Sequence, residues 1–208
     1  MQNILVLGAT GSIGLSTLIV VARYPEQYRA YALAAHRSVE AMVALCTEYR
    51  PVHAVMSDAD AAAELEHRLA GVVDTTVHAG DAPMIALAES GDIDTVMAAI
   101  VGFAGLSAAL AAARAGKRLL MANKEALVSA GSIFMDAVRE GGALLLPVDS
   151  EHNAMFQCLP ADARARPQME RVEKILLTAS GGPFRGKSRS ELTEVTPDQA
   201  CAHPNWSM

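Results

Sequence analysis

Residues 4–14 read ILVLGATGSIG, and this stretch decides the fold of the 208-residue chain. Its apolar run ends at Gly8, and Gly11 and Gly14 follow at regular intervals. A run of consecutive apolar residues predicts a strand that is covered on both faces. Glycines after such a strand let the backbone come close to a pyrophosphate, and a helix that starts there offers it N–H donors. The stretch therefore predicts a strand, a nucleotide-binding turn and a helix.

The spacing of these glycines, Gly-x-x-Gly-x-x-Gly, departs from the usual Gly-x-Gly-x-x-Gly of dinucleotide-binding turns. The strand–turn–helix context is nevertheless the one that the usual pattern requires. Thr10 and Ser12 add hydroxyl donors to the turn. The alternative is an ordinary tight turn in which Ser12 caps the helix.

The same rhythm continues along the chain. Apolar runs fall at residues 4–7, 31–35, 52–56, 72–77, 96–101, 119–122 and 143–146, and the clearest helical patterns at 12–23 and 39–49. Alternating strands and helices predict an α/β fold with a doubly wound, mostly parallel, Rossmann-like sheet. Residues 95–113 carry no charge, but Gly102 and Gly105 interrupt them, so we expect a strand, a turn and an Ala-rich helix rather than a membrane span.

The end of the second apolar run indicates which dinucleotide binds. A site for NAD places Asp or Glu there to hold the ribose 2′-hydroxyl, whereas this chain has His36, Arg37 and Ser38. A guanidinium and a hydroxyl suit a 2′-phosphate. The residues therefore predict NADPH as the cofactor; the alternative is an exposed arginine without a ligand.

Asn123, Lys124 and Glu125 follow the run at 119–122. Doubly wound sheets bind ligands at the carboxyl ends of their strands. Asn123 also suits a helix N-cap and Glu125 a first helical turn, which leaves Lys124 unexplained. A cation there suits a substrate oxygen, and both interpretations stay open.

Asp149, Ser150 and Glu151 follow the run at 143–146. Two carboxylates with a hydroxyl between them suit a hard divalent cation such as Mg²⁺ or Mn²⁺. The alternative is that Asp and Ser merely cap the helix expected at 151–159.

Three further residues point to a substrate. Ser180 precedes two glycines, whose backbone N–H groups can bind a phosphate. His203 and Trp206 can cover a ligand and exclude water. The alternative is a mobile glycine-rich loop with a structural histidine.

The alternation of apolar runs and helical patterns changes after residue 147, so we expect two domains. Residues 1–147 are predicted to form the NADPH-binding domain, and 148–208 the start of an α+β domain that binds metal and substrate. That second part is predicted to hold the helix at 151–159, a strand at 174–177, a flexible loop and a capped turn at 196–201. About 60 residues are too few to close a core alone, so we expect either a truncated domain or one that another chain completes.

Composition excludes several functions. A hydrophobic content of 51% can fill a core, and a net charge of −6 without a basic run argues against nucleic-acid binding. Cys46, Cys158 and Cys201 are widely spaced and form no Cys-x-x-Cys pair, which predicts neither disulfides nor zinc but a reducing, cytoplasmic setting. The first residues lack the basic region of a signal peptide.

Six motifs, in order, resemble the 1-deoxy-D-xylulose 5-phosphate reductoisomerase family: GATGSIG, VMAAIVG, ANKEALV, LLPVDSEHNAMFQ, LTASGGPFR and TPDQACAHPNWSM. The resemblance runs from residue 4 to residue 208 and is weaker between 37 and 90. It implies an NADPH- and metal-dependent rearrangement and reduction of 1-deoxy-D-xylulose 5-phosphate to 2-C-methyl-D-erythritol 4-phosphate, a step toward isoprenoid precursors. The metal would be Mg²⁺ or Mn²⁺, with Co²⁺ as a further option, and the full-length protein a homodimer.

The resemblance also implies roles for single residues. The cofactor would bind Thr10, Gly11, Ser12, Ile13, His36, Arg37, Ser38, Asn123 and Glu125. The metal would bind Asp149 and Glu151, which with Lys124 and His203 are the expected catalytic residues. The sugar phosphate would bind Lys124, Ser150, Glu151, Ser180, His203 and Trp206.

Two departures and two rival functions accompany this resemblance. Many family members have Gly, Lys and Asn in place of His36, Arg37 and Ser38, and the chain ends before a further metal ligand of the family. One rival is an NADP-dependent reductase of the semialdehyde dehydrogenase type, which needs an activated cysteine. The other is a module that binds NADPH and turns nothing over.

Overall fold

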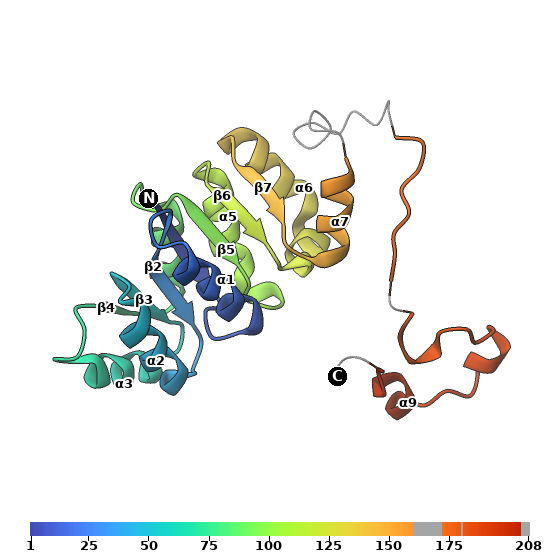
Figure 1. The fold of residues 1–208 in the computed structure, drawn as a ribbon, viewed down its shortest axis with the longest axis horizontal. Helices are drawn as coiled ribbons and strands as arrows, with labels where there is room; N and C mark the ends of the chain where they lie inside the picture. Colours follow the sequence, from blue (N-terminus) through green and yellow to red (C-terminus); the bar gives the residue numbers. More distant parts are fainter. Residues whose placement is uncertain (160–171, 180, 205–208) are drawn as a thin grey trace. The chain divides into compact units, whose positions relative to one another are not determined.

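The computed structural model describes residues 1–159, 172–179 and 181–204. The chain divides into two compact units, Met1–Asp149 and Ser150–Met208 (Figure 1). The sequence predicts a domain boundary after residue 147. The division into units differs by two residues, because Val148 and Asp149 fall in the first unit.

The first unit is a parallel, doubly wound α/β sheet, as predicted. Its seven strands stand in the order β4-β3-β2-β1-β5-β6-β7, and every neighbouring pair is parallel. The strands are β1 (Gln2–Leu7), β2 (Tyr28–Ala35), β3 (His53–Met56), β4 (Thr76–Ala79), β5 (Thr95–Ala98), β6 (Arg118–Met121) and β7 (Leu144–Pro147). The helices are α1 (Ser12–Arg23), α2 (Val39–Tyr49), α3 (Ala59–Leu69), α4 (Asp81–Glu89), α5 (Leu106–Arg114) and α6 (Lys124–Gly141), with the 3-10 turn η1 (Phe103–Gly105) before α5.

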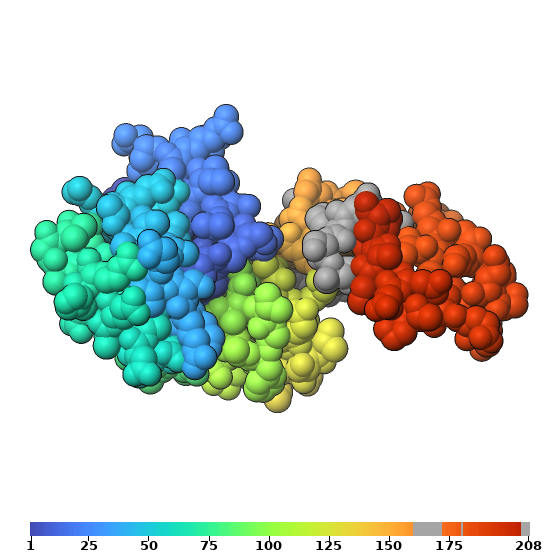
Figure 2. Space-filling model, turned by 90° about the horizontal axis from the view of Figure 1, so that it is seen from below, coloured from blue at the N-terminus to red at the C-terminus, as the bar shows by residue number. Residues whose placement is uncertain are grey.

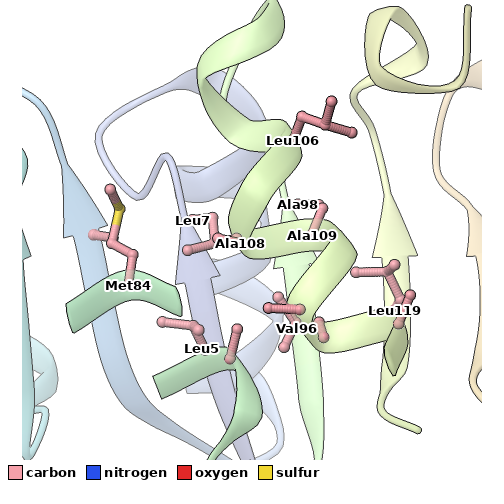
Figure 3. Close-up of a cluster of buried hydrophobic side chains, with 14 of the residues drawn as sticks. Leu5, Leu7, Met84, Val96, Ala98, Leu106, Ala108, Ala109 and Leu119 are labelled. Atoms are coloured by element: carbon pink, nitrogen blue, oxygen red, sulfur yellow. The ribbon is translucent and has the colours of Figure 1, made fainter. Parts of the chain in front are cut away.

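The sheet separates two hydrophobic cores. Residues of β1 alternate between them: Leu5 and Leu7 point to the core under α4, α5 and α6, and Ile4 and Val6 to the core under α1, α2 and α3. Figure 3 shows the first core, where alanines of α5 lie close over Val96 and Leu7. The space-filling view shows the first unit, from its blue N-terminal residues to the yellow residues of α6, as one continuous body (Figure 2). Strands covered on both faces explain the consecutive apolar runs.

Most predicted elements of the first unit are confirmed, with α1 and α2 matching residue by residue. The run at 72–77 is an exception, because β4 starts only at Thr76. The backbone N–H groups of Val72 and Val73 instead donate to the Leu69 carbonyl oxygen at the end of α3. These apolar residues therefore belong to a turn.

The uncharged stretch 95–113 divides into β5, η1 and α5, as expected. β5 stops at Ala98, three residues before the predicted end at residue 101. Within the described parts of the chain, no helix is long and apolar enough to cross a membrane.

The second unit contains α7 (Ser150–Cys158), α9 (Pro197–Cys201) and the 3-10 turns η3 (Gly182–Phe184) and η4 (Ser190–Leu192). Thr196 and Gln199 form a reciprocal capping box at the start of α9, which confirms the capped turn with proline near its start. The strand predicted at 174–177 is wrong, because residues 172–179 form neither strand nor helix. Ile175, Leu176 and Leu177 are exposed there, and an apolar run becomes a strand only beside a partner that takes its backbone hydrogen bonds.

Candidate functional site

The candidate site lies at the carboxyl ends of the central strands. β1 pairs with β2 on one side and with β5 on the other, so the strand order reverses at β1. Open α/β sheets bind ligands at such a reversal. The loops after β1, β2, β5 and β6 all leave the sheet at this edge, because the strands are parallel.

The β1–α1 turn is tightly closed by its glycines. A Cβ atom on Gly14 would lie 2.3 Å from the Gly8 carbonyl oxygen, and one on Gly8 would lie 2.7 Å from the Ala99 carbonyl oxygen. Helix α1 begins at Ser12 with Gly11 as its N-cap and no side-chain cap, so the alternative in which Ser12 caps the helix is wrong. Gly11, Ser12 and Ile13 are exposed at a helix N-terminus, which suits an anion.

A pocket of about 130 Å³ opens at this edge. It is lined by Ile13, Ala99, Ile100, Val101, Ala122, Asn123, Lys124 and Glu125. The pocket thus brings together residues from the β1–α1 turn and from the start of α6, which were predicted as site residues separately. Residues 99–101 were not predicted as site residues, because the apolar run 96–101 predicts a strand throughout, whereas β5 ends at Ala98.

Asn123 ties two of these loops together. Its Nδ2 donates to the carbonyl oxygens of Ile100 and Gly102, each at 2.7 Å, and its Oδ1 accepts from the Ala126 N–H at 3.1 Å. The residue is buried. The N-cap interpretation of Asn123 is therefore confirmed, and the side chain also holds the loop after β5 against the start of α6. Glu125 lies exposed in the first turn, where a negative charge is favourable.

Lys124 forms an ion pair with Asp149. Its Nζ lies 3.0 Å from Asp149 Oδ2, and the side chains are 57% and 12% exposed. A lysine in the first turn of a helix opposes the helix dipole, so a carboxylate partner compensates an otherwise unfavourable position. The first acidic residue after β7 is thereby placed beside the pocket that Lys124 lines.

Ser150 and Glu151 belong to the second unit, at the start of α7. The Ser150 hydroxyl donates to Glu151 Oε2 at 2.9 Å. Across residues 1–159, 172–179 and 181–204, no group of three His, Cys, Asp or Glu side chains is close enough to hold a metal ion. Two carboxylates do fit Mg²⁺, which takes one or two of them together with water and substrate oxygens. That Asp149 and Glu151 share one ion stays a prediction.

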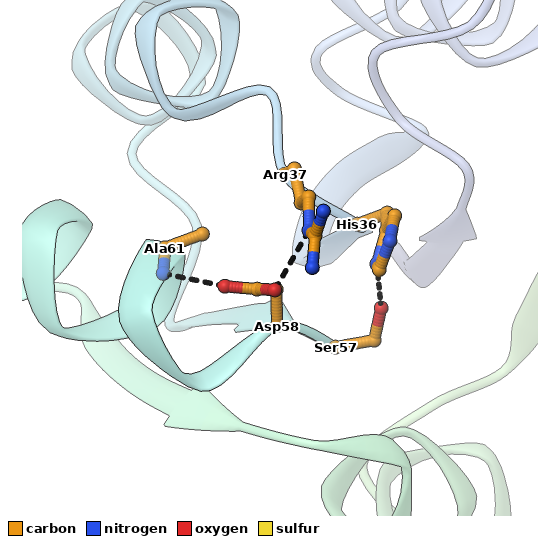
Figure 4. A network of polar contacts seen from close by, with 5 residues as sticks. All are labelled: His36, Arg37, Ser57, Asp58 and Ala61. Atoms are coloured by element: carbon orange, nitrogen blue, oxygen red, sulfur yellow. Dashed lines mark hydrogen bonds and ion pairs between the residues drawn. The ribbon is translucent and has the colours of Figure 1, made fainter.

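The end of β2 carries His36 and Arg37, and the end of β3 faces them with Ser57 and Asp58 (Figure 4). Arg37 Nε donates to Asp58 Oδ2 at 2.7 Å, and His36 Nδ1 lies 2.7 Å from Ser57 Oγ. Ser38 is the N-cap residue of α2, but its hydroxyl makes no capping bond. Ser57 and Asp58 were not predicted as site residues; the only signal was an acidic residue at a helix start.

In the second unit, His203 follows α9, and η3 contains the second glycine of the glycine pair. A Cβ atom on Gly182 would lie 3.9 Å from His203 Cδ2, so Gly182 and His203 are neighbours. Ser180 and Trp206 lie outside the described residues.

Cys46 is not an activated nucleophile of the kind a semialdehyde dehydrogenase needs. Cys46 is buried in the core under α2, and burial raises the pKa of its thiol to about 12. Cys158 and Cys201 are exposed. A nucleophilic cysteine needs a lowered pKa and a neighbouring base, so Cys46 is unsuited to that chemistry.

A larger, shallow hollow of about 300 Å³ lies at the opposite edge of the sheet. Gln2, Thr95 and Arg118, at the amino ends of their strands, contribute to its lining, and Arg118 Nη1 donates to Gln2 Oε1. The helices that follow parallel strands present their N-termini at the carboxyl edge, where phosphate is bound. The smaller pocket is therefore the candidate site.

Comparisons with known proteins agree with this geometry. The sequence matches the family model of 1-deoxy-D-xylulose 5-phosphate reductoisomerase over residues 4–131 and the model of that family's C-terminal domain over residues 145–208. The reductoisomerase of Cupriavidus metallidurans is 60% identical over 210 residues, which cover 100% of this chain and 53% of the relative. That of Dechloromonas aromatica is 58% identical and is covered to 52%. The chain thus spans about half the length of the curated relatives it matches.

Solved structures give the same result. A DOX-P reductoisomerase in complex with NADPH, fosmidomycin and magnesium superimposes with a TM-score of 0.89 at 44% identity, covering 100% of this chain and 52% of that one. The enzyme of Zymomonas mobilis in complex with NADPH gives a TM-score of 0.87 at 46% identity, covering 96% and 51%. With family models matched over most of its length, this chain belongs to the 1-deoxy-D-xylulose 5-phosphate reductoisomerase family.

Proposed function

We propose that the whole protein converts 1-deoxy-D-xylulose 5-phosphate to 2-C-methyl-D-erythritol 4-phosphate, with NADPH and a divalent metal, on the way to isoprenoid precursors. One observation carries the proposal: a single pocket at the switch point of the sheet is lined by Ile13 of the glycine turn and by Asn123, Lys124 and Glu125. The ion pair of Lys124 with Asp149 brings a candidate metal ligand to the same place.

The cofactor site follows from the loops at this edge. Thr10, Gly11, Ser12 and Ile13 would bind the pyrophosphate and the nicotinamide end, because the exposed start of a helix suits an anion. His36, Arg37 and Ser38 would bind the adenosine end, and Asn123 and Glu125 would border the nicotinamide. When bound, NADPH supplies the hydride. Family members crystallised with NADPH support this cofactor.

The metal site would use Asp149 and Glu151, whose oxygen donors suit Mg²⁺ or Mn²⁺, with Co²⁺ as a further option. A family member crystallised with magnesium supports this choice. The bound ion supplies Lewis-acid polarisation of the substrate oxygens. Lys124 offers a positive charge to the substrate at the pocket, and Ser150 a hydroxyl.

The remaining predicted residues would enclose the sugar phosphate. Ser180 would hold its phosphate, and His203 with Trp206 would cover it and exclude water. The proximity of His203 to Gly182 supports this arrangement. From family membership we further expect a homodimeric enzyme of the cytoplasm, with no nucleic-acid or membrane partner.

The test is NADPH oxidation by the full-length protein with 1-deoxy-D-xylulose 5-phosphate and Mg²⁺. Asp149→Asn is expected to lower the rate about a hundredfold or more, because Lewis-acid polarisation contributes several kcal/mol. Asp136→Asn is the matched control: it removes a carboxylate that pairs with Arg139 on the exposed face of α6. A rate that Asp149→Asn leaves unchanged would contradict the proposal.

A second candidate is an NADPH-binding module without turnover. It is favoured by the first unit, which by itself contains the seven-stranded sheet, both cores and the pocket. Assaying the 208-residue chain beside the full-length protein separates the two: NADPH binding by both, with turnover by the longer one alone, supports the module for this chain and the reductoisomerase for the whole.

A further inference from the structure

The carboxyl ends of β2 and β3 are held in register beyond the last paired strand residues. Ala35 pairs with Met56, and the pattern continues as Ser57 N–H donates to the Ala35 carbonyl oxygen at 3.0 Å and Asp58 N–H to that of His36 at 3.4 Å. His36 therefore faces Ser57, and Arg37 faces Asp58, as Figure 4 shows.

Within this register, the Asp58 carboxylate accepts a hydrogen bond from the Arg37 guanidinium. The bond of 2.7 Å uses Arg37 Nε, so the two terminal amino groups of the guanidinium are not consumed by it. The Arg37 side chain is 72% exposed and that of Asp58 17%. The carboxylate thus lies on the inner side, and the guanidinium presents its outer edge to solvent.

Asp58 is itself fixed. It is the N-cap of α3, and its Oδ1 accepts from the Ala61 N–H at 3.0 Å. This backbone hydrogen bond, followed by the bond from Arg37, lowers the pKa of the Asp58 carboxyl. The group that orients Arg37 is therefore an ionised carboxylate anchored on a helix start rather than on a loose loop.

We propose that Asp58 is a positioning residue that makes the site select NADPH over NADH, by holding the Arg37 guanidinium toward the 2′-phosphate. The inference rests on the proposed function, in which the adenosine end of NADPH binds at the end of β2. Asp58 does not touch the nucleotide; it restricts a long side chain that would otherwise lose much rotamer freedom on binding.

Long-range electrostatics alone predicts the opposite change in NADPH affinity. Asp58 adds a negative charge near a phosphate, so its removal would tighten NADPH binding if long-range charge decided the outcome. Exposed charges interact weakly and are screened, whereas the entropy lost in ordering an arginine is large. The positioning effect should therefore dominate.

The experiment compares the dissociation constants of NADPH and NADH by calorimetry on the 208-residue chain. Asp58→Asn and Asp58→Ser both keep a good helix N-cap but lose the carboxylate. Each is expected to raise the Kd for NADPH about three- to fivefold, the range of an exposed ion pair, and to leave that for NADH unchanged.

Two further variants complete the test. Glu40→Gln removes the same charge from the Arg68–Glu40 ion pair, which also joins α2 to α3, and should change neither Kd. Arg37→Gln should weaken NADPH binding about tenfold or more, the effect of losing a charged hydrogen bond, and adding Asp58→Asn to it should weaken binding no further.

The possible failures are distinguishable. If Asp58→Asn tightens NADPH, weakens both nucleotides equally or leaves the preference intact, the inference is overturned while the proposed function stands. Additive effects of Arg37→Gln and Asp58→Asn overturn it as well. An unmodified chain without any preference for NADPH overturns the proposed cofactor and this inference together.

Discussion

At the scale of single residues, the glycine turn shows how one residue type serves different purposes. Gly8 has a φ of +84° and packs against the backbone after β5, and Gly14 lets α1 lie directly on the turn. Gly11 has a φ of −83°, and a Cβ atom on it would lie 3.4 Å from the Gly8 carbonyl oxygen. Packing requires Gly8 and Gly14, whereas Gly11 lies exposed at the helix N-terminus where we propose that the cofactor phosphates bind.

This difference predicts unequal costs for two similar substitutions. Gly14→Ala should lower the free energy of unfolding by about 3 kcal/mol, because its methyl group would overlap backbone atoms that cannot move aside. Gly11→Ala should cost less than about 1 kcal/mol, since its conformation suits alanine and its methyl group would meet the Gly8 carbonyl oxygen only at van der Waals distance. Urea denaturation of the two variants measures both values. Equal destabilisation would show that α1 does not pack on the turn as described.

The sequence pattern located all three glycines but could not assign these roles. Spacing identifies a turn, but it does not show that Gly8 packs against the backbone of Ala99, which follows a strand far away in the chain. Nor does it show that Gly14 packs against Gly8 and Ala9 once α1 lies on the turn. Asp58 was missed for the same reason, because its partner Arg37 is 21 residues distant and meets it only when β2 pairs with β3.

At the scale of elements, Asn123 joins the loop after β5 to helix α6 through three hydrogen bonds. Asn123→Ala should lower the free energy of unfolding by about 2–4 kcal/mol, since it removes the cap and leaves two carbonyl oxygens without their donor. Asn123→Ser should recover about 1 kcal/mol of this, because serine also caps. Thermal or urea unfolding tests the order, and a serine variant no better than the alanine one would refute the capping role.

The histidine pair of β3 and β4 predicts a pH dependence of stability. His78 Nε2 lies 3.1 Å from His53 Nδ1, and the Tyr31 ring packs edge-on against His53. Burial, then the charge of His78, lowers the pKa of His53 below 6.5, and Asp92 opposes this. The folded chain therefore binds fewer protons there than the unfolded chain, so stability is full above about pH 6.5 and falls as the pH drops.

Urea midpoints between about pH 7.5 and about pH 5.5 measure this effect. His78→Asn should flatten the acid-side loss, because it removes the charge that disfavours protonation of His53. A slope that is the same in the variant, or stability that rises on acidification, would contradict the assignment.

Elements were predictable where the local pattern alone determines them. The residue pattern alone indicates the apolar faces and the ends of helices α1 and α2, and both helices were predicted to the residue. The apolar runs at 72–77 and 174–177 look equally like strands, yet only the end of the first pairs with a neighbour. Pairing is a tertiary property, which local periodicity cannot reveal.

At the scale of the whole molecule, parallel topology assembles the candidate site. Because β1, β5 and β6 end at one edge, the turn containing Ile13, the loop at 99–101 and the start of α6 line one pocket. The sequence placed two of these segments there through strand-end reasoning and missed the third. The sharing of one metal ion by Asp149 and Glu151 stays a prediction, since the two residues belong to different units.

The position of bound NADPH decides between the pocket at the carboxyl ends of the strands and the hollow at their amino ends. A crystal structure of the chain grown with NADPH should place the nicotinamide among Ile13, Ile100 and Lys124, with the 2′-phosphate at Arg37. Density for the nucleotide beside Gln2 and Arg118, at the amino ends of the strands, would contradict the whole assignment of the site.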